Sequence, residues 1–202
     1  MVLAEGTKKR ISVRSIAVTG ILAALASVLM FLDFSVPVMP GFIKLDFSEL
    51  PALLAAYALG PVSGVVVCLV KNLVNVLSTS TGGVGELSNF VLGACFVLPA
   101  GLIYQKHKTR KAAFWGATLG AAVMAVVSIF SNYYIMYPIY TAFMPMEVIL
   151  GMYQAIVPSV QTLWDALLWF NLPFTFFKGM CSVVIALLVY KHISPLLKGK
   201  KN

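Results

Sequence analysis

The chain is poor in charge and in the side chains that usually carry chemistry. Only 11% of its 202 residues are charged and 60% are hydrophobic, which leaves too little polar surface to coat a soluble globule. The two histidines, His107 and His192, stand in no cluster of metal-ligating residues. The glycine-rich segment 82–86 lacks the Lys-Ser/Thr ending of a phosphate-binding loop. We therefore expect a membrane protein with no catalytic residue, no metal site and no cofactor of its own.

Cysteine is also scarce. Cys68, Cys95 and Cys181 all lie within apolar runs. This placement is typical of small buried side chains and does not indicate a disulfide framework.

Apolar runs indicate an all-α, polytopic membrane protein with one transmembrane domain over residues 1–202. Windows of spanning length predict six transmembrane helices, at about 14–33, 48–59, 61–79, 86–105, 112–137 and 171–191. Only Gly60 and Pro61 separate the second helix from the third, which suits a tight turn. We expect the second helix to be short for that reason.

Two connections are predicted to be irregular. The segment 34–47 contains Pro37, Pro40 and Gly41, so it is predicted to be a loop, although it is rich in apolar residues. The segment 141–170 mixes apolar and polar residues, which favours an extracytoplasmic connection with a short interfacial helix.

Charge predicts the orientation in the cell membrane, because Lys and Arg are enriched in short cytoplasmic loops. Twelve basic residues fall on one side of a bundle of six spans: Lys8, Lys9, Arg10, Arg14, Lys106, Lys108, Arg110, Lys111, Lys191, Lys198, Lys200 and Lys201. Six acidic residues fall on the other: Asp33, Asp46, Glu49, Glu86, Glu147 and Asp165. We expect both termini to be cytoplasmic. The net charge of +8 is then a signal of topology, and no nucleic-acid partner is predicted.

Three lysines lie outside the cytoplasmic groups. Lys44 is in the first loop, where we expect it to pair with Asp46 or Glu49. Lys71 and Lys178 lie inside the third and sixth predicted helices, and ionisable side chains at such positions usually face a cavity or a partner. For Lys178, snorkelling to the interface and contact with a ligand are both open. For Lys71, a polar contact buried between helices and contact with a ligand are both open.

Asn132 lies in the outer half of the fifth predicted helix. A single Asn in a span most often bonds to a neighbouring helix. The alternative is that Asn132 shares a polar patch with Lys178, because both residues are expected in the outer half of the membrane.

Several motifs together give the chain a resemblance to a known family. They are the segment 31–53, Gly60-Pro61, Lys71-Asn72-Leu73, the segment 83–89, Asn132-Tyr133 followed by Pro138-Ile139-Tyr140, and the Pro-Phe-x-x-x-Lys-Gly motif at 173–179. On these motifs the chain resembles the riboflavin-binding S-components of energy-coupling factor (ECF) vitamin transporters. The motifs run from the first predicted helix to the last.

The resemblance implies a six-helix bundle that captures riboflavin from outside, with the first loop closing over the vitamin as a lid. Residues that it implies in ligand contact are Asn132, Thr175 and Lys178, with further contacts from the loop residues Gly41, Phe42, Ile43, Lys44, Leu45 and Asp46, and Tyr133 as part of the wall. The family commonly has Asn where this chain has Thr175, and Thr has a shorter reach and no amide.

The resemblance also implies partners, namely a transmembrane coupling protein and two ATPase subunits. Small residues on the first predicted helix repeat every four positions and allow close helix approach: Thr19, Gly20, Ala23, Ala24 and Ser27. They form either a docking face for the coupling protein or a packing face within the bundle. Other functions remain open, namely an S-component for another vitamin or a flavin nucleotide, an intramembrane enzyme, and a membrane scaffold without a ligand.

Overall fold

A computed structural model describes residues 12–79 and 81–198, with side chains up to residue 189. The predicted cytoplasmic residues Lys8, Lys9, Arg10, Lys200 and Lys201 lie outside these residues. The longer helices are α1 (Val13–Phe31), α2 (Glu49–Ala58), α3 (Pro61–Asn75), α4 (Val84–His107), α5 (Arg110–Ser131), α7 (Met146–Gln154) and α9 (Leu172–Lys198). The short elements are β1 (Phe34–Ser35), β2 (Lys44–Leu45), α6 (Tyr137–Tyr140) and α8 (Leu163–Ala166). A 3₁₀ turn at Val76–Ser78 extends α3, and π-helical turns at Asn132–Met136 and Leu167–Asn171 lead into α6 and α9.

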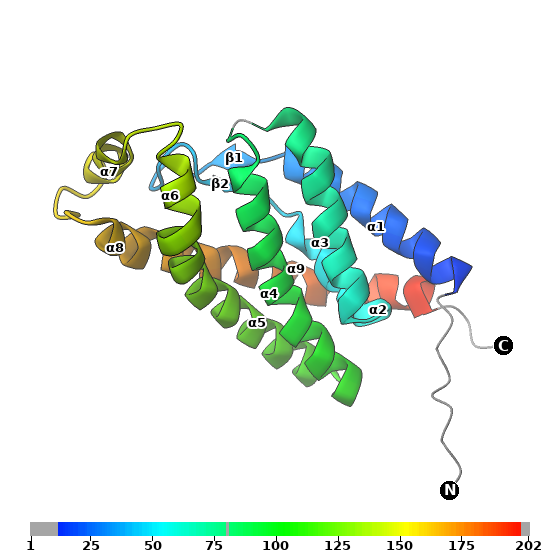
Figure 1. Cartoon of the computed structure of the whole chain (residues 1–202). Helices are drawn as coiled ribbons and strands as arrows, with labels where there is room; N and C mark the ends of the chain where they lie inside the picture. Colours follow the sequence, from blue (N-terminus) through cyan, green and yellow to red (C-terminus); the bar gives the residue numbers. More distant parts are fainter. Residues whose placement is uncertain (1–11, 80, 199–202) are drawn as a thin grey trace, which may run out of the picture.

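The protein is an all-α, multi-pass membrane protein. Within the residues that the structure describes, five helical segments are long and apolar enough to cross a membrane: Val13–Phe31, Pro61–Ser78, Val84–His107, Arg110–Tyr140 and Leu163–Val189. They form an elongated bundle in which α4 packs along both α3 and α5, and α5 packs along α9 (Figure 1).

The second predicted span is much shorter than a membrane crossing. Helix α2 has 10 residues, so at about 1.5 Å per residue it covers roughly half of a 30 Å hydrocarbon core. The tight turn at Gly60 and Pro61 is present, with Gly60 at a positive φ of 114° and Pro61 as the first residue of α3. Because α2 ends at that turn, its first residue, Glu49, lies near the middle of the bundle. The polypeptide that precedes Glu49 must therefore descend into the bundle as a loop.

The last helical segment begins earlier than the predicted residue 171. The Thr162 hydroxyl accepts a hydrogen bond from the Asp165 N–H, and the Asp165 carboxylate accepts one from the Thr162 N–H. This capping box satisfies backbone N–H groups at a helix start, so the helix begins at Leu163. The predicted connection 141–170 is shortened accordingly, and it contains the short helix α7.

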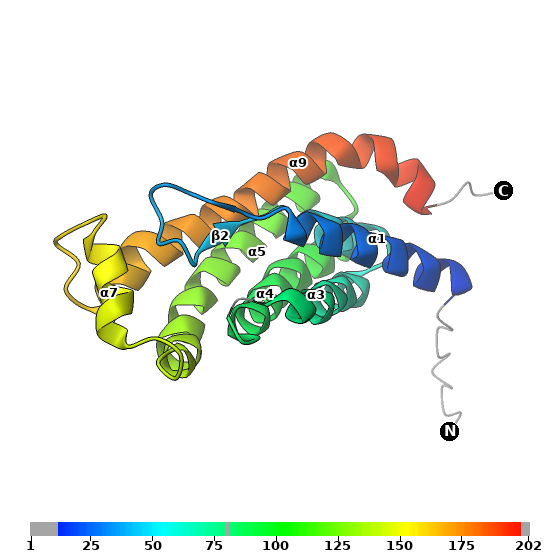
Figure 2. The ribbon, with the colours of Figure 1, turned by 90° about the horizontal axis from the view of Figure 1, so that it is seen from above.

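The two ends of the bundle differ in charge. The start of α1, the connection between α4 and α5, and the last turns of α9 lie toward one end, whereas β1, β2 and α7 lie toward the other (Figures 1 and 2). The basic residues Lys106, Lys108, Arg110 and Lys111 all lie at or beside the connection between α4 and α5. This basic group therefore lies at the end of the bundle where α1 begins and α9 ends.

The five small residues predicted as a docking face on α1 are divided between two faces. Ala23 is 2% exposed, Ser27 is also buried, and the Ser27 hydroxyl donates to the Ala23 carbonyl at 2.9 Å. Thr19 is half-buried, whereas Gly20 and Ala24 are exposed. Because α1 packs against α2 and α3, packing within the bundle accounts for Ala23 and Ser27.

Small residues on α5 allow a close helix approach. A Cβ atom placed on Gly120 would lie 2.3 Å from the Phe96 carbonyl oxygen of α4. One added on Gly116 would meet Ile103 at 3.1 Å. Two glycines four residues apart thus let α4 and α5 pack backbone to backbone, which is the arrangement that small residues allow in membranes. This pair of helices forms one wall of the cavity described below.

Candidate functional site

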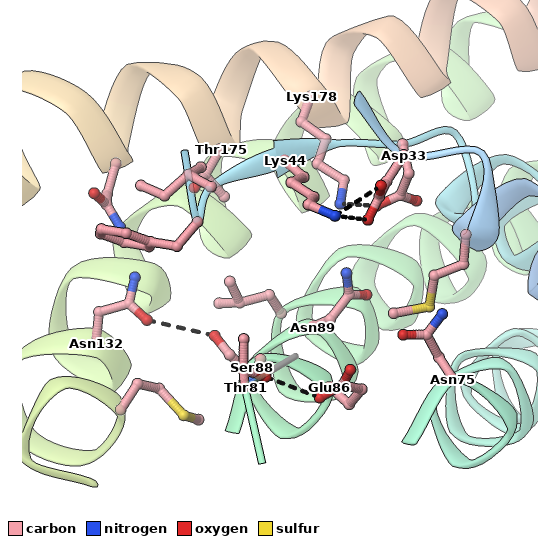
Figure 3. Close-up of a pocket in the computed structure, with 18 of the residues that line it drawn as sticks. Asp33, Lys44, Asn75, Thr81, Glu86, Ser88, Asn89, Asn132, Thr175 and Lys178 are labelled. Atoms are coloured by element: carbon pink, nitrogen blue, oxygen red, sulfur yellow. Dashed lines mark hydrogen bonds and ion pairs between the residues drawn. The ribbon is translucent and has the colours of Figure 1, made fainter. Parts of the chain in front are cut away.

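A cavity of about 440 Å³ lies beneath the connection between α1 and α2. Its lining comes from the α1–α2 connection, the end of α3, the first turns of α4, the segment from α5 to α6, and the start of α9. Figure 3 shows Asn132, Thr175, Lys178, Asn89 and Asn75 arranged around it. The volume is within the range of small-molecule sites, and the lining combines apolar and aromatic side chains with many polar and charged ones.

Four charged side chains form a buried cluster at one side of this cavity. The Lys178 ammonium donates to Asp46 Oδ2 at 2.8 Å and lies 3.4 Å from Glu49 Oε2. The Lys71 ammonium donates to Glu49 Oε1 at 2.8 Å and also to the Ser48 hydroxyl. Two acids and two bases are thereby joined, with Glu49 between the two lysines. Charges this deeply buried are tolerated because they are paired.

The start of α2 holds the acids of the cluster in place. Asp46 Oδ1 accepts a hydrogen bond of 2.8 Å from the Ser48 N–H, and Glu49 is the first residue of the helix. Burial raises the pKa of the Asp46 carboxyl, but the nearby ammonium groups of Lys178 and Lys71 outweigh burial and hold that pKa well below its usual range. Asp46 is therefore a carboxylate at neutral pH.

These contacts correct one prediction and resolve another. Lys44 pairs with neither Asp46 nor Glu49, because its ammonium lies 3.0 Å from Asp33 Oδ1. The antiparallel pairing of β1 with β2 explains the difference, since Ser35 lies opposite Lys44 and this register brings the lysine close to Asp33. Lys71 is fully buried and does not line the cavity. Of the two alternatives for this lysine, the structure therefore favours a buried polar contact between helices over contact with a ligand.

The loop over the cavity is anchored by apolar contacts. The Phe42 ring packs against Tyr137, Tyr140 and Tyr153, with ring centroids 6.0 to 6.5 Å apart. Met39 belongs to the same buried apolar cluster. The loop therefore has a folded conformation in which backbone pairing, an ion pair and aromatic packing all hold it over the cavity.

Two asparagines enter the cavity from π-helical turns. Asn132 begins one turn and Asn171 ends the other. Ser88 and Asn132 Oδ1 are 3.4 Å apart, while Asn171 Oδ1 accepts a 2.9 Å hydrogen bond from the Tyr153 hydroxyl. Single π-helical turns inside α-helices are frequent at functional sites. Here the two turns bring Asn132, Met136 and Asn171 to the lining of the cavity.

The structure brings together most of the predicted contact residues. Those that line the cavity are Gly41, Phe42, Ile43, Lys44, Asp46, Asn132, Thr175 and Lys178. Leu45 is buried but lies outside the lining. Tyr133 is 37% exposed and packs against Trp164 and Tyr134 on the outer surface.

Several lining residues were not singled out from the sequence. They include Asn75, Thr81, Glu86, Asn89 and Asn171. Glu86 and Asn89 belong to the motif at 83–89, and their spacing of three residues on a helix places them on one face. That spacing was a usable signal. Asn171 had no such signal, because it lay at the predicted boundary between a loop and a helix.

Comparison with known proteins identifies the family. Residues 14–190 match the family described as "ECF transporter, substrate-specific component". The chain belongs to this family. ECF substrate-specific components are transport proteins and not enzymes, and the matched residues contain every side chain of the cavity and of the buried charge cluster.

Relatives of this ECF component carry specific names. It is 33% identical over 177 residues to the riboflavin transporter RibU of Staphylococcus aureus (strain TCH60), covering 88% of each chain. It is 30% identical over 193 residues to the riboflavin transporter FmnP of Bacillus subtilis (strain 168), covering 94% of this chain and 97% of that relative. A solved structure described as the S component of a bacterial ECF transporter is 32% identical, with a TM-score of 0.72 over 92% of this chain and 98% of that one.

Proposed function

We propose that this protein is the riboflavin-specific component of an ECF transporter and that riboflavin binds in the cavity beneath the α1–α2 connection. The observation that carries the proposal is the convergence of Asn132, Thr175 and Lys178 on one cavity of about 440 Å³. Asn132 follows α5, whereas Thr175 and Lys178 lie three residues apart on α9. Two relatives at 33% and 30% identity over most of the chain are riboflavin transporters, which agrees with the proposal.

The chemistry of the cavity suits a flavin. An isoalloxazine ring is flat and mostly apolar, with hydrogen-bonding edges like those of an amide. Phe42, Phe174 and Tyr137 supply apolar surface, while Asn132, Thr175 and Lys178 supply polar groups at the rim. We assign ligand contact to these residues and to Gly41, Ile43, Lys44 and Asp46 of the loop.

The α1–α2 connection acts as an extracellular lid in this proposal. Helix α2 and the loop before it together cross the bundle as its sixth transmembrane element, within one substrate-binding domain. The basic group between α4 and α5 then marks the cytoplasmic side. We place both termini on that side, because the start of α1 and the end of α9 lie toward the same end of the bundle. The cavity faces outward because the lid lies at the opposite end of the bundle.

A titration tests the proposed ligand. The purified protein, cleared of bound flavin, should quench flavin fluorescence when riboflavin is added, and thiamine should not compete. Tight binding of a flavin nucleotide with weak binding of riboflavin would favour the alternative of a nucleotide carrier. The absence of saturable binding to any flavin would reject the proposal and favour a scaffold or an unrelated function.

Transport further requires partners, since no motif for nucleotide hydrolysis occurs in the sequence. We propose a transmembrane coupling protein and two ATPase subunits, with docking on the exposed small residues of α1. Gly20 and Ala24 lie on that exposed face. Thr19 lies at the border of that face. Ala23 and Ser27 are buried and pack α1 against the rest of the bundle.

Substitution of Ala24 by Trp should reduce assembly with the coupling module and leave riboflavin affinity unchanged, because Ala24 is exposed and lies outside the cavity lining. Co-purification with the module and a riboflavin titration measure the two effects. The control is Val184→Trp, which places the same bulky side chain at an exposed site on α9. Equal co-purification of the two variants would move the docking surface away from this face of α1.

A further inference from the structure

The carboxylates that line the cavity outnumber the ammonium groups. Asp33, Asp46, Glu49 and Glu86 line it, against Lys44 and Lys178. Asp33 pairs with Lys44, and both Asp46 and Glu49 lie beside Lys178. Among the residues that the structure describes, Glu86 is the lining carboxylate without a basic partner.

Glu86 is held in place by hydroxyl groups. Its Oε2 accepts hydrogen bonds from Thr79 at 2.9 Å and from Thr81 at 3.1 Å. The hydroxyl oxygens of these threonines accept in turn from the N–H groups of Gly83 and Gly85. The threonine protons are thereby directed at Glu86. Glu86 is 6% exposed and has no basic partner among the described residues, so its carboxylate is neither well solvated nor paired with a cation there.

Asn89 provides a second, independent observation on the same face of α4. Its Oδ1 is buried and has no hydrogen-bond partner among the described residues. Figure 3 draws Glu86, Ser88 and Asn89 on the α4 side of the cavity, across from Lys178 and Lys44. This side therefore carries the Glu86 carboxylate and, next to it, a buried amide oxygen that has no donor among the described residues. A buried acceptor without a donor is costly.

We propose that Glu86 is a specificity-determining residue, which favours an uncharged ligand bearing hydroxyl donors and rejects its phosphate ester. The inference rests on the proposed riboflavin site. A polyhydroxyl chain offers several donors to Glu86. A phosphate adds about −1.5 to −2 charge and brings acceptor oxygens instead of donors. Lys44 and Lys178 do not offset that charge, because each is already paired with a carboxylate. Discrimination thus comes from a repulsive element built into the site.

Titration with riboflavin and with riboflavin 5′-phosphate tests this assignment at fixed ionic strength. We expect the wild-type protein to prefer riboflavin by at least about tenfold, and Glu86→Gln to reduce that preference by about tenfold, because the amide keeps the shape and removes the charge. Asn89→Asp, which adds a second carboxylate on the same face, should widen the preference. The matched control is Glu147→Gln, an exposed acid on α7 whose loss should leave the ratio of the two affinities unchanged.

The outcomes separate this inference from the proposed function. Equal wild-type affinity for riboflavin and its phosphate overturns the role of Glu86 without any variant. A wild-type ratio retained in Glu86→Gln, or a ratio that does not widen in Asn89→Asp, overturns it as well. If the wild-type protein binds neither flavin, the proposed riboflavin site itself fails.

Discussion

Replacing Lys178 with alanine is expected to weaken riboflavin binding by a factor on the order of 100 or more. The ammonium lines the cavity and forms ion pairs with Asp46 at 2.8 Å and Glu49 at 3.4 Å. Its removal deletes a ligand contact and also leaves two neighbouring carboxylates without this cation. Truncating a charged group that is hydrogen-bonded across a buried binding interface, as proposed here between the ammonium and riboflavin, typically costs about 2–5 kcal/mol, which corresponds to roughly 30-fold to several thousand-fold in affinity.

Fluorescence titration with riboflavin measures this effect. Lys111→Ala is the control, because Lys111 is exposed at the far end of the bundle, in the first turn of α5. The control should bind riboflavin like the wild-type protein. A Lys178→Ala variant with wild-type affinity would show that the ammonium contacts neither the ligand nor a group on which binding depends.

A double variant separates the two causes. Asp46→Asn combined with Lys178→Ala removes one carboxylate together with the ammonium. If unpaired charge is the main cost, the double variant should recover part of the lost affinity. If the direct ligand contact is the main cost, the double variant should bind as weakly as Lys178→Ala.

Replacing Lys71 with methionine should lower the stability of the protein by about 3–5 kcal/mol, the usual cost of breaking a buried ion pair. Lys71 is fully buried, and its ammonium is 2.8 Å from Glu49 Oε1. Methionine fills similar space but leaves the Glu49 carboxylate with only the more distant contact to Lys178. The loss of folding stability should exceed any loss of riboflavin affinity, because Lys71 does not line the cavity.

Thermal unfolding in detergent, followed without ligand, measures the loss of stability. The double variant Lys71→Met with Glu49→Gln should recover a large part of the loss, since it removes the carboxylate along with the ammonium. Lys111→Met serves as the exposed control. The ion pair has no stabilising role if Lys71→Met unfolds at the same temperature as that control.

Much of the fold is predictable because the membrane acts on local properties of the chain. A run of about 20 apolar residues is a sufficient signal for a span, and it needs no knowledge of neighbouring helices. The runs at 14–33, 86–105 and 112–137 accordingly coincide with the helical segments Val13–Phe31, Val84–His107 and Arg110–Tyr140 to within a few residues. The start of the last helix was missed, although the capping box of Thr162 and Asp165 is itself a local signal.

The candidate site was predictable where a family motif carried it. Lys178 and Thr175 stand in the Pro-Phe-x-x-x-Lys-Gly motif, and the structure places both on the cavity. Tyr133 follows Asn132 directly, yet on a helix adjacent residues point about 100° apart, so one faces the cavity and the other the outer surface. Motif membership alone does not distinguish these two directions.

The position of the membrane-crossing segments and the grouping of basic residues are therefore properties of the sequence, because they depend on residue type and on distance along the chain. The pairing of the buried charges depends on the tertiary structure. Lys44 is two residues from Asp46 but pairs with Asp33, while Asp46 pairs with Lys178, which is 132 residues away. A short α2 brings Asp46 and Glu49 to the depth of Lys71 and Lys178, and only the folded bundle sets that common depth. In a medium that solvates charge poorly, the nearest opposite charge in space decides the partner.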